Sequence, residues 1–407
     1  MTLLRSWVAS ANSAETPFPL NNLPYGVFSK SEGARRLGVA IGDQILDISA
    51  VAADLPVAEA LLSDPRGWNS VMEQGAADWA ALRHALTRLL AEGAPTRPDA
   101  LVAQKDVTLH MPFTVSEFTD FYAGKHHATN VGTMFRGPEN ALPPNWLHIP
   151  IGYNGRASSV VVSGTDLRRP WGQLKGPNDA APRWAPSARF DIELEMGAIV
   201  GTSSNGPISV DTADAHIFGY VLLNDWSARD IQAWEYQPLG PFQAKATATS
   251  ISPWIVTKAA LEPFRCATPA REKDLLPHLQ DTGPMLYDIP LSVSLNGETI
   301  IRTNYNELYY SAAQQLAHHT TSGCPMRVGD LLGSGTISGP ERENRGSLLE
   351  LSWGGKEPFE TSSGPRSFIE DGDTLGLHGA AQGDGYQIGF GDCIGTVLPA
   401  HDDPFKG

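Results

Sequence analysis

The segment from Asp191 to Met196 reads Asp-Ile-Glu-Leu-Glu-Met, with an acidic residue at every second position. Alternate side chains of a β-strand point to the same face, so Asp191, Glu193 and Glu195 would lie on one face, each about 7 Å from the next. Carboxylates gathered in this way offer the oxygen ligands that Mg²⁺ and Ca²⁺ prefer. The pattern is equally typical of a strand with one solvated face, so the segment alone leaves both interpretations open.

Another acidic residue, Asp225, ends a long apolar run at 217–223 and precedes residues that favour a helix. An acid at the end of a buried strand is well placed to bind a cation together with other carboxylates. Asp225 could instead cap the N-terminus of the helix that follows. It is therefore a candidate ligand with a structural alternative.

The stretch from Asp120 to Gly132 combines a carboxylate, the phenol of Tyr122 and the adjacent histidines His126 and His127. Adjacent side chains point in different directions in most backbones, so we expect at most one imidazole to act in a reaction. Histidine is the side chain best suited to accept a proton near neutral pH. Combined with the acidic segments, the stretch favours a catalytic histidine.

Two glycine-rich segments, 333–339 and 383–391, lack the Gly-Lys-Ser/Thr ending of a phosphate-binding loop. We expect them to form tight β-turns, although Thr336 could still contact a small ligand. The sequence also lacks the Gly-x-Ser-x-Gly motif, which argues against a serine hydrolase of the α/β type.

Short apolar runs alternate with turn residues along most of the chain and predict a mainly β protein. The 40 glycines and 31 prolines also disfavour long helices. The runs that predict strands lie at 39–41, 45–48, 160–162, 192–200, 217–224, 252–256, 291–295, 348–353 and 374–377.

Three segments predict helices. The clearest is an amphipathic helix near 70–92, and two shorter ones are expected over 227–234 and, after a cap at Asn306, over 307–319. The linker-like segment 93–105 suggests a domain boundary near 112–118. We therefore expect an N-terminal domain over 1–115 and a larger domain over 116–407.

The formal net charge of −15 opposes binding to a nucleic-acid backbone. No apolar run is long enough to cross a membrane, and the first 20 residues do not resemble a secretory signal. The three cysteines show neither disulfide-framework nor zinc-site spacing. We therefore expect a cytoplasmic protein without nucleic-acid or membrane partners.

Long ordered motifs of the chain resemble the fumarylacetoacetate hydrolase family, and in particular its fumarylacetoacetases. The motifs are Asp120-Phe-Tyr with His127-Ala-Thr-Asn-Val-Gly, Gly152-Tyr-Asn-Gly-Arg-Ala-Ser-Ser, Glu193-x-Glu195 and the run from Asn224 to Phe242. The resemblance covers most of the chain. It implies a small N-terminal SH3-like barrel, a large C-terminal mixed β-sandwich roll and a homodimer.

The same resemblance implies an activity. It is the metal-dependent hydrolysis of a carbon–carbon bond in 4-fumarylacetoacetate, an anionic diketo acid, to fumarate and acetoacetate, the last step of tyrosine and phenylalanine breakdown. The implied cation is Ca²⁺ and/or Mg²⁺, and its implied ligands are Asp120, Glu193, Glu195 and Asp225. Lys245 and Thr249 fall at a cation rim. Because a protonated lysine has no lone pair to donate, we expect Lys245 to act electrostatically.

Further roles follow from the resemblance alone. His127 matches the general base and Glu350 the carboxylate that orients it. The implied donors to the reacting oxyanion are Arg229, Gln232 and Lys245. The implied substrate contacts are Tyr122, Arg136, Tyr153, Gln232, Tyr236 and Thr336.

Two departures from the family pattern stand beside these residues. Ala248 occupies a position where glycine is expected, and Lys125-His126 replaces the usual Arg-Gln. Two alternatives stay open. The first is a sister activity, an acylpyruvate hydrolase or an oxo-acid decarboxylase or isomerase. The long N-terminal segment and the stretch from Asp120 to His127 argue against it. The second is a non-catalytic cation-binding scaffold, against which the presence of His127 and Glu350 argues.

Overall fold

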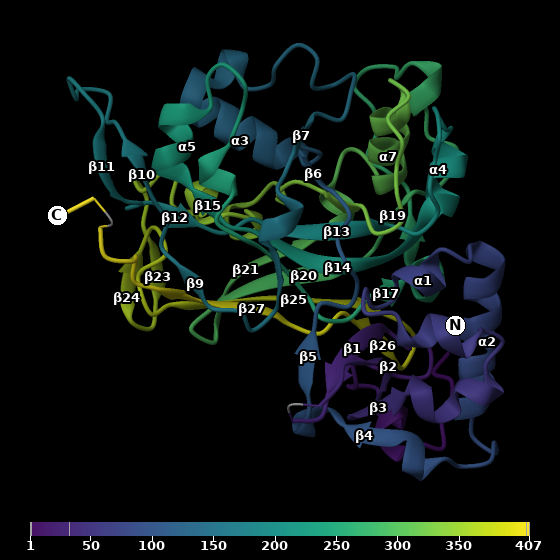
Figure 1. Ribbon diagram of the computed structural model, residues 1–407. Coiled ribbons are helices and arrows are strands. Elements are labelled where there is room, and N and C mark those ends of the chain that lie inside the picture. Colours follow the sequence, from purple (N-terminus) through teal and green to yellow (C-terminus); the bar gives the residue numbers. More distant parts are fainter. Residues whose placement is uncertain (1, 32, 404, 407) are drawn as a thin grey trace.

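Three large β-sheets dominate the computed structural model, which describes residues 2–31, 33–403 and 405–406 (Figure 1). The mainly β prediction is confirmed. There are also smaller two-stranded sheets. They pair β10 (Trp171–Leu174) with β11 (Arg183–Pro186), β12 (Phe190–Asp191) with β15 (Ser227–Ala228), β18 (Arg265–Cys266) with β19 (Leu286–Tyr287), and β23 (Phe359–Thr361) with β24 (Gly364–Arg366).

The N-terminal sheet has five strands in the order β4-β3-β2-β1-β5. Their bounds are β1 Tyr25–Ser29, β2 Arg36–Ile41, β3 Gln44–Asp47, β4 Leu101–Ala103 and β5 Thr108–His110. Two helices accompany this sheet, α1 (Asn69–Met72) and α2 (Ala76–Leu90). The helix predicted near 70–92 is present over Ala76–Leu90, but Gly75, with a φ of +91°, separates it from α1.

The eight-stranded sheet runs in the order β7-β6-β22-β13-β14-β16-β8, with β17 paired to β14. Its strands are β6 Phe118–Phe121, β7 Gly152–Asn154, β8 Val160–Val162, β13 Leu194–Val200, β14 Ile217–Asp225, β16 Thr249–Ile251, β17 Val256–Thr257 and β22 Leu331–Gly333. The predicted strand 252–256 falls mostly between β16 and β17, where Pro253 lacks the N–H that a ladder requires.

The six-stranded sheet runs in the order β21-β20-β25-β27-β9, with β26 paired to β25. Its strands are β9 Leu167–Arg168, β20 Pro290–Leu295, β21 Glu298–Asn304, β25 Thr374–Gln382, β26 Gln387–Gly389 and β27 Cys393–Leu398.

Strand β14 is buried on both faces, which explains its continuous apolar sequence. Tyr220 and Leu222 belong to the core that includes Leu291 and Leu377 of the six-stranded sheet. The alternate residues of β14, among them Leu223, belong to the cluster that includes the N-terminal sheet. Packing against both neighbours therefore holds β14 and its terminal Asp225 in place.

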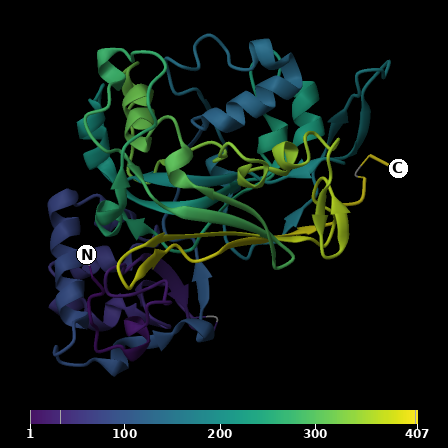
Figure 2. The ribbon, with the colours of Figure 1, turned by 180° about the vertical axis from the view of Figure 1, so that it is seen from behind.

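Helices lie on the face of the eight-stranded sheet that is turned away from the six-stranded sheet, as both ribbon views show (Figures 1 and 2). They are α3 Lys125–Arg136, α4 Val210–His216, α5 Arg229–Glu235 and α7 Ala312–Thr320. The helix predicted from Asn306 starts later, because Ser311 forms a capping box with Gln314. Among the described residues, no helix is long and apolar enough to span a membrane.

Two further α-helices are short: α6 (Lys258–Leu261) and α8 (Leu348–Leu351). The strand predicted over 348–353 is wrong, since this run forms α8. The Ser347 side chain accepts a hydrogen bond from the backbone N–H of Glu350 and so starts the helix.

Candidate active site

Four carboxylates from separate parts of the chain meet at one end of the eight-stranded sheet. They belong to Asp120 on β6, Glu193 immediately before β13, Glu195 on β13 and Asp225 on β14, and one oxygen of each lies within 4.8 Å of the others. All four side chains are buried. The solvated-strand interpretation of 191–196 is therefore wrong.

Strand pairing explains the convergence. Asp120 lies opposite Gly333 of β22, and Gly333 lies opposite Gly197 of β13. A Cβ at Gly333 would come within 2.6 Å of Asp120 Oδ1 and 3.0 Å of Glu195 Oε2. The missing side chain therefore provides the space in which the carboxylates of two strands approach each other.

The electrostatics of this carboxylate cluster are uneven. Burial, followed by the charge of Asp225, raises the pKa of Asp120 well above its usual range, and burial with the charge of Asp120 does the same for Glu195. Burial acts in the same direction on Glu193, but the charges of Lys245 and Arg229 outweigh it and hold the pKa of Glu193 well below its usual range. Asp120 and Glu195 therefore resist ionisation in this cluster, and a positive ion would stabilise their ionised forms.

Three buried oxygens of the cluster have no hydrogen-bond partner within the described chain: Asp120 Oδ1, Glu195 Oε1 and Asp225 Oδ1. The same is true of Thr249 Oγ1, on the strand position opposite Asp225. An unpartnered buried oxygen is costly unless a ligand satisfies it. Oxygen donors without sulfur or nitrogen are the set that Ca²⁺ and Mg²⁺ prefer. The residues therefore fit a divalent cation.

Two cationic side chains border the carboxylates. Lys245 Nζ lies 2.7 Å from Asp225 Oδ2 and 2.8 Å from Glu193 Oε1. Arg229 Nη1 lies 2.6 Å from Glu193 Oε1 and donates to Gln232 Oε1 at 3.2 Å. Asp225 lies at the end of β14 and α5 begins at Arg229, so the interpretation of Asp225 as a helix cap is wrong.

His127 lies in the first turn of α3 and forms a buried pair with Glu350 on α8. Its Nδ1 lies 2.5 Å from Glu350 Oε2, and its Nε2 lies 3.3 Å from Thr336 Oγ1. Although burial acts to raise it, interaction with the His127 imidazole and hydrogen bonds from Asn130 and Ser347 lower the pKa of Glu350. An ionised Glu350 can accept a hydrogen bond from Nδ1–H, and in that tautomer Nε2, which lies beside Thr336, carries the lone pair that can accept a proton.

A cavity of about 370 Å³ connects these groups. Its lining includes His127 and members of the carboxylate cluster with their bordering cations: Asp120, Glu193, Arg229 and Lys245. Five of the six residues expected to contact substrate also line it: Tyr122, Arg136, Tyr153, Gln232 and Tyr236. Thr336 contacts His127. Most of the expected site residues therefore line one cavity. Glu195 and Asp225 adjoin it through the carboxylate cluster, and Glu350 and Thr336 adjoin it through His127.

The departures from the family pattern point away from the cavity. His126 Nε2 lies 3.6 Å from Glu307, and Lys125 pairs with Glu272. Ala248 is part of the hydrophobic core. None of these side chains competes with His127 for the cavity.

The sequence interpretation missed the residues that hold Glu350. Its oxygens accept hydrogen bonds from Asn130, Ser338 and Ser347. The Ser-x-x-Glu spacing of Ser347 and Glu350 is a capping signature that could have revealed this turn. Ser338 and Asn130 carried no comparable signal in the sequence.

Comparison with known proteins adds family membership to this geometry. The model described as "Fumarylacetoacetase N-terminal" matches residues 21–112, and that described as "Fumarylacetoacetate (FAA) hydrolase C-terminal" matches residues 116–398. The chain is 49% identical to fumarylacetoacetase from Rattus norvegicus, with 95% of this chain and 97% of that protein covered. It is 47% identical to fumarylacetoacetase from Dictyostelium discoideum, with 98% and 99% covered.

The fold is similar to that of maleylpyruvate hydrolase from Sphingobium sp. SYK-6, solved with manganese(II) and pyruvate. The TM-score is 0.53 at 18% identity, with 93% of this chain and 100% of that chain covered. Since both family models match and the curated relatives are nearly half identical over almost the full chain, the protein belongs to the fumarylacetoacetate hydrolase family.

Proposed function

We propose that the protein hydrolyses a carbon–carbon bond of fumarylacetoacetate and releases fumarate and acetoacetate. Relatives that share 49% and 47% of its residues carry the name fumarylacetoacetase. The observation that carries the proposal is one cavity lined by both the buried His127 and the carboxylates Asp120 and Glu193. Cleaving a 1,3-diketone requires a nucleophilic water, donors for an alkoxide and a means to stabilise the departing enolate.

His127 supplies the base. Its Nδ1–H donates to Glu350, so Nε2 accepts the proton of the attacking water on the cavity side. General base catalysis of this kind contributes about 10²- to 10⁴-fold. After the bond breaks, the protonated imidazole is positioned to return its proton to the carbon of the departing enolate.

Arg229, Gln232 and Lys245 supply the donors for the alkoxide. Arg229 Nη2 is buried and has no hydrogen-bond partner within residues 2–31, 33–403 and 405–406, so its N–H bonds are free for a substrate oxygen. Lys245 adds a buried positive charge beside the same cavity. Loss of one such donor typically costs about 3 kcal/mol of transition-state stabilisation.

Asp120, Glu193, Glu195 and Asp225 would hold the cation, for which we propose Ca²⁺ and/or Mg²⁺. When bound, such an ion supplies Lewis-acid stabilisation to the negative charge that develops on the diketone oxygens. The unpartnered oxygens of the cluster and Thr249 support this proposal. Lys245 neutralises part of the cluster without ligating the ion, since an ammonium group has no free lone pair.

The anionic substrate meets cationic and phenolic groups in the cavity despite the net charge of −15. Arg136 binds a carboxylate through its guanidinium, aided by Tyr122, Tyr153, Tyr236 and Thr336. In the structure, Arg136 donates to the backbone oxygens of Asn140 and Ala141, which keeps it at the cavity wall.

We extend the proposal to organisation and location. Residues 1–115 form an SH3-like barrel domain and residues 116–407 the catalytic domain. We also propose a homodimer, in which a partner subunit would cover exposed apolar side chains such as Leu239 and Phe242. The three cysteines carry no disulfide and support a reducing compartment such as the cytoplasm.

Product analysis tests the function. Purified protein is given fumarylacetoacetate or an acylpyruvate, each before and after chelation of divalent ions. We expect fumarate and acetoacetate to form only with the cation present, and acylpyruvate to react much more slowly. Faster cleavage of acylpyruvate would instead assign the sister hydrolase activity, and no turnover of either would contradict catalysis of this kind.

A further inference from the structure

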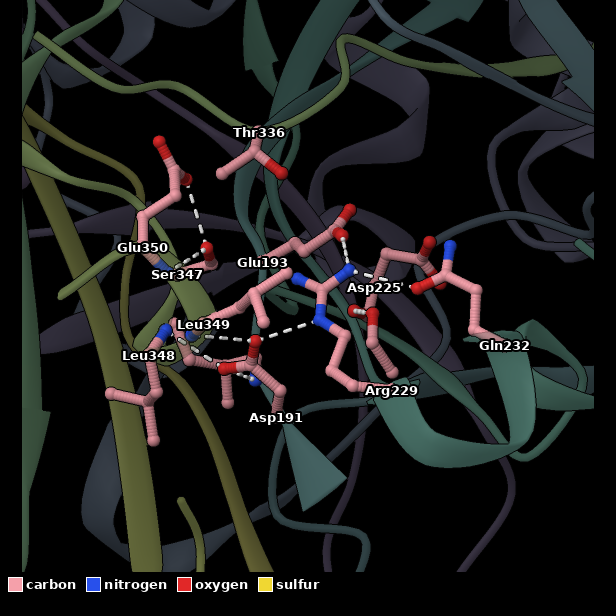
Figure 3. A network of polar contacts seen from close by, with 12 residues as sticks. Asp191, Glu193, Asp225, Arg229, Gln232, Thr336, Ser347, Leu348, Leu349 and Glu350 are labelled. Carbon is pink, nitrogen blue, oxygen red and sulfur yellow. Dashed lines mark hydrogen bonds and ion pairs between the residues drawn. The ribbon is translucent and has the colours of Figure 1, made fainter. Parts of the chain in front are cut away.

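Asp191 is a fully buried carboxylate that is not part of the carboxylate cluster but bonds to two parts of the active site. Its Oδ2 accepts from Arg229 Nε at 2.8 Å and from the backbone N–H of Leu349 at 3.0 Å. Its Oδ1 accepts from the backbone N–H of Leu348 at 2.8 Å and of Ile192 at 2.7 Å. Figure 3 shows the carboxylate lying between the start of α8 and the guanidinium.

On one side, Asp191 fixes the plane of the Arg229 guanidinium. The guanidinium is a rigid planar fork, so two anchored nitrogens determine the direction of the third. Asp191 holds Nε, while Glu193 and Gln232 contact Nη1. The remaining nitrogen, Nη2, is the one left without a partner in the described part of the chain. Asp191 therefore helps to direct the free donor of Arg229.

On the other side, Asp191 fixes the turn that carries Glu350. Leu348 and Leu349 are the first two residues of α8, and their N–H groups have no intrahelical acceptor. The Asp191 carboxylate satisfies both. Glu350 follows directly and contacts His127 at 2.5 Å. A shift of Asp191 would thus move the carboxylate that orients the base.

We infer that Asp191 is a positioning residue that holds the oxyanion donor Arg229 and the His127–Glu350 pair in one fixed geometry. The inference rests on the proposed function, since it assigns Asp191 a part in that reaction. Stability alone is a weak reason for such a residue, because a buried ion pair often contributes little net stability. Misplacement of catalytic groups by about 1 Å, in contrast, can cost about 10²-fold in rate.

The test compares Asp191→Asn with Asp373→Asn. Asp373 is a matched control because it is also buried and accepts hydrogen bonds from an arginine, Arg366, and from the backbone N–H of Glu370. None of these three residues lines the cavity. We expect Asp191→Asn to lower kcat about 10²-fold with KM changed less than about threefold. Asp373→Asn should lower Tm to a similar extent and leave kcat within about twofold.

A second variant, Asp191→Glu, keeps the charge and moves the carboxylate by one methylene group. If Asp191 acts by positioning, the kcat of Asp191→Glu should fall as well. If the fold needs only its negative charge, that kcat should stay unchanged. A kcat within about twofold of the parent in the folded fraction of either Asp191 variant would overturn the inference, as would an equal fall in Asp373→Asn. A parent protein that fails to turn over fumarylacetoacetate would instead refute the proposed function.

Discussion

The N-terminal sheet and the end of the eight-stranded sheet that carries the carboxylate cluster both contain buried acids. They differ in whether the carboxylate oxygens have hydrogen-bond partners. Asp47 of the N-terminal sheet uses both oxygens locally: Oδ2 accepts from Arg36 and Oδ1 from Ser49. In the carboxylate cluster, Asp120, Glu195 and Asp225 each keep one buried oxygen without a partner in the described chain. The acid of the N-terminal sheet is thus satisfied by neighbouring residues, whereas these three acids of the cluster each retain an oxygen that a ligand can use.

This difference separates stability from function. The interior of the N-terminal sheet is apolar, with side chains such as Leu46 and Val39 fully buried, and burial of this kind stabilises the folded chain. The cluster instead brings like charges together, which costs free energy in the absence of a ligand. We therefore expect changes at the cluster to affect catalysis and cation binding, and changes in the N-terminal sheet to affect stability alone.

Removal of the cation should have the largest effect. We expect chelation to lower kcat/KM about 10³-fold or more, because several kcal/mol of charge stabilisation disappear.

Stability should respond to pH as well. Burial raises the folded-state pKa of Asp120 and Glu195, so the stability they contribute is full below about pH 4 and is lost as pH rises toward neutrality. Chelation should therefore lower Tm more at about pH 8 than at about pH 5.5, which thermal unfolding measures.

His127→Gln should rank next, with kcat about 10²- to 10⁴-fold lower, because the base that activates water is lost. His126→Gln is the matched control, since this imidazole faces Glu307. Steady-state kinetics should find the control within about twofold of the parent. Equal losses in both variants would refute the distinction between the two histidines.

Leu46→Ala should lower the free energy of unfolding by about 2–5 kcal/mol, because it opens a cavity in the core of the N-terminal sheet. Chemical denaturation measures this loss. The kcat of the folded fraction should stay within about twofold of the parent. A large fall in kcat without a fall in stability would contradict the expectation that changes in the N-terminal sheet affect stability alone.

Asp330→Asn should have the smallest effect. Burial raises the pKa of Asp330 to about 6, so the stability this group contributes is full below about pH 4 and is lost as pH rises through 6. Asparagine does not ionise, and it can still accept from the backbone N–H of Arg327. Denaturation at about pH 5 and pH 7.5 should show the variant gaining about 1–2 kcal/mol relative to the parent. A pH-independent difference would contradict a raised pKa.

The mainly β fold could be predicted because the pattern of apolar residues along a segment reflects which of its faces are buried. Continuous apolar runs such as Ile217–Leu223 and alternating ones such as Leu291–Leu295 became strands of the expected type. The run 348–353 misled because a short apolar segment fits a strand and a buried helix equally well. Only the Ser-x-x-Glu signature at Ser347 distinguished the two, and it is one weak signal among many serines.

The candidate site was predictable for residues with distinctive chemistry at distinctive spacing. The Glu-x-Glu pair, Asp225 and His127 stand out by type and position, and they lie around one cavity or one carboxylate cluster. Asp191 belonged to the same acidic pattern, yet its bonds to Arg229 and to α8 depend on strand ends brought together by the fold. Such contacts leave no local trace in the sequence.

The most direct test of the cation site is an anomalous difference map from crystals grown with Mn²⁺. We expect one strong peak among Asp120, Glu193, Glu195 and Asp225, with ligand oxygens at about 2.0–2.6 Å. Turnover of fumarylacetoacetate in the same preparation would link the ion to the reaction. A catalytically active preparation whose map has no peak at these four carboxylates would contradict the assignment.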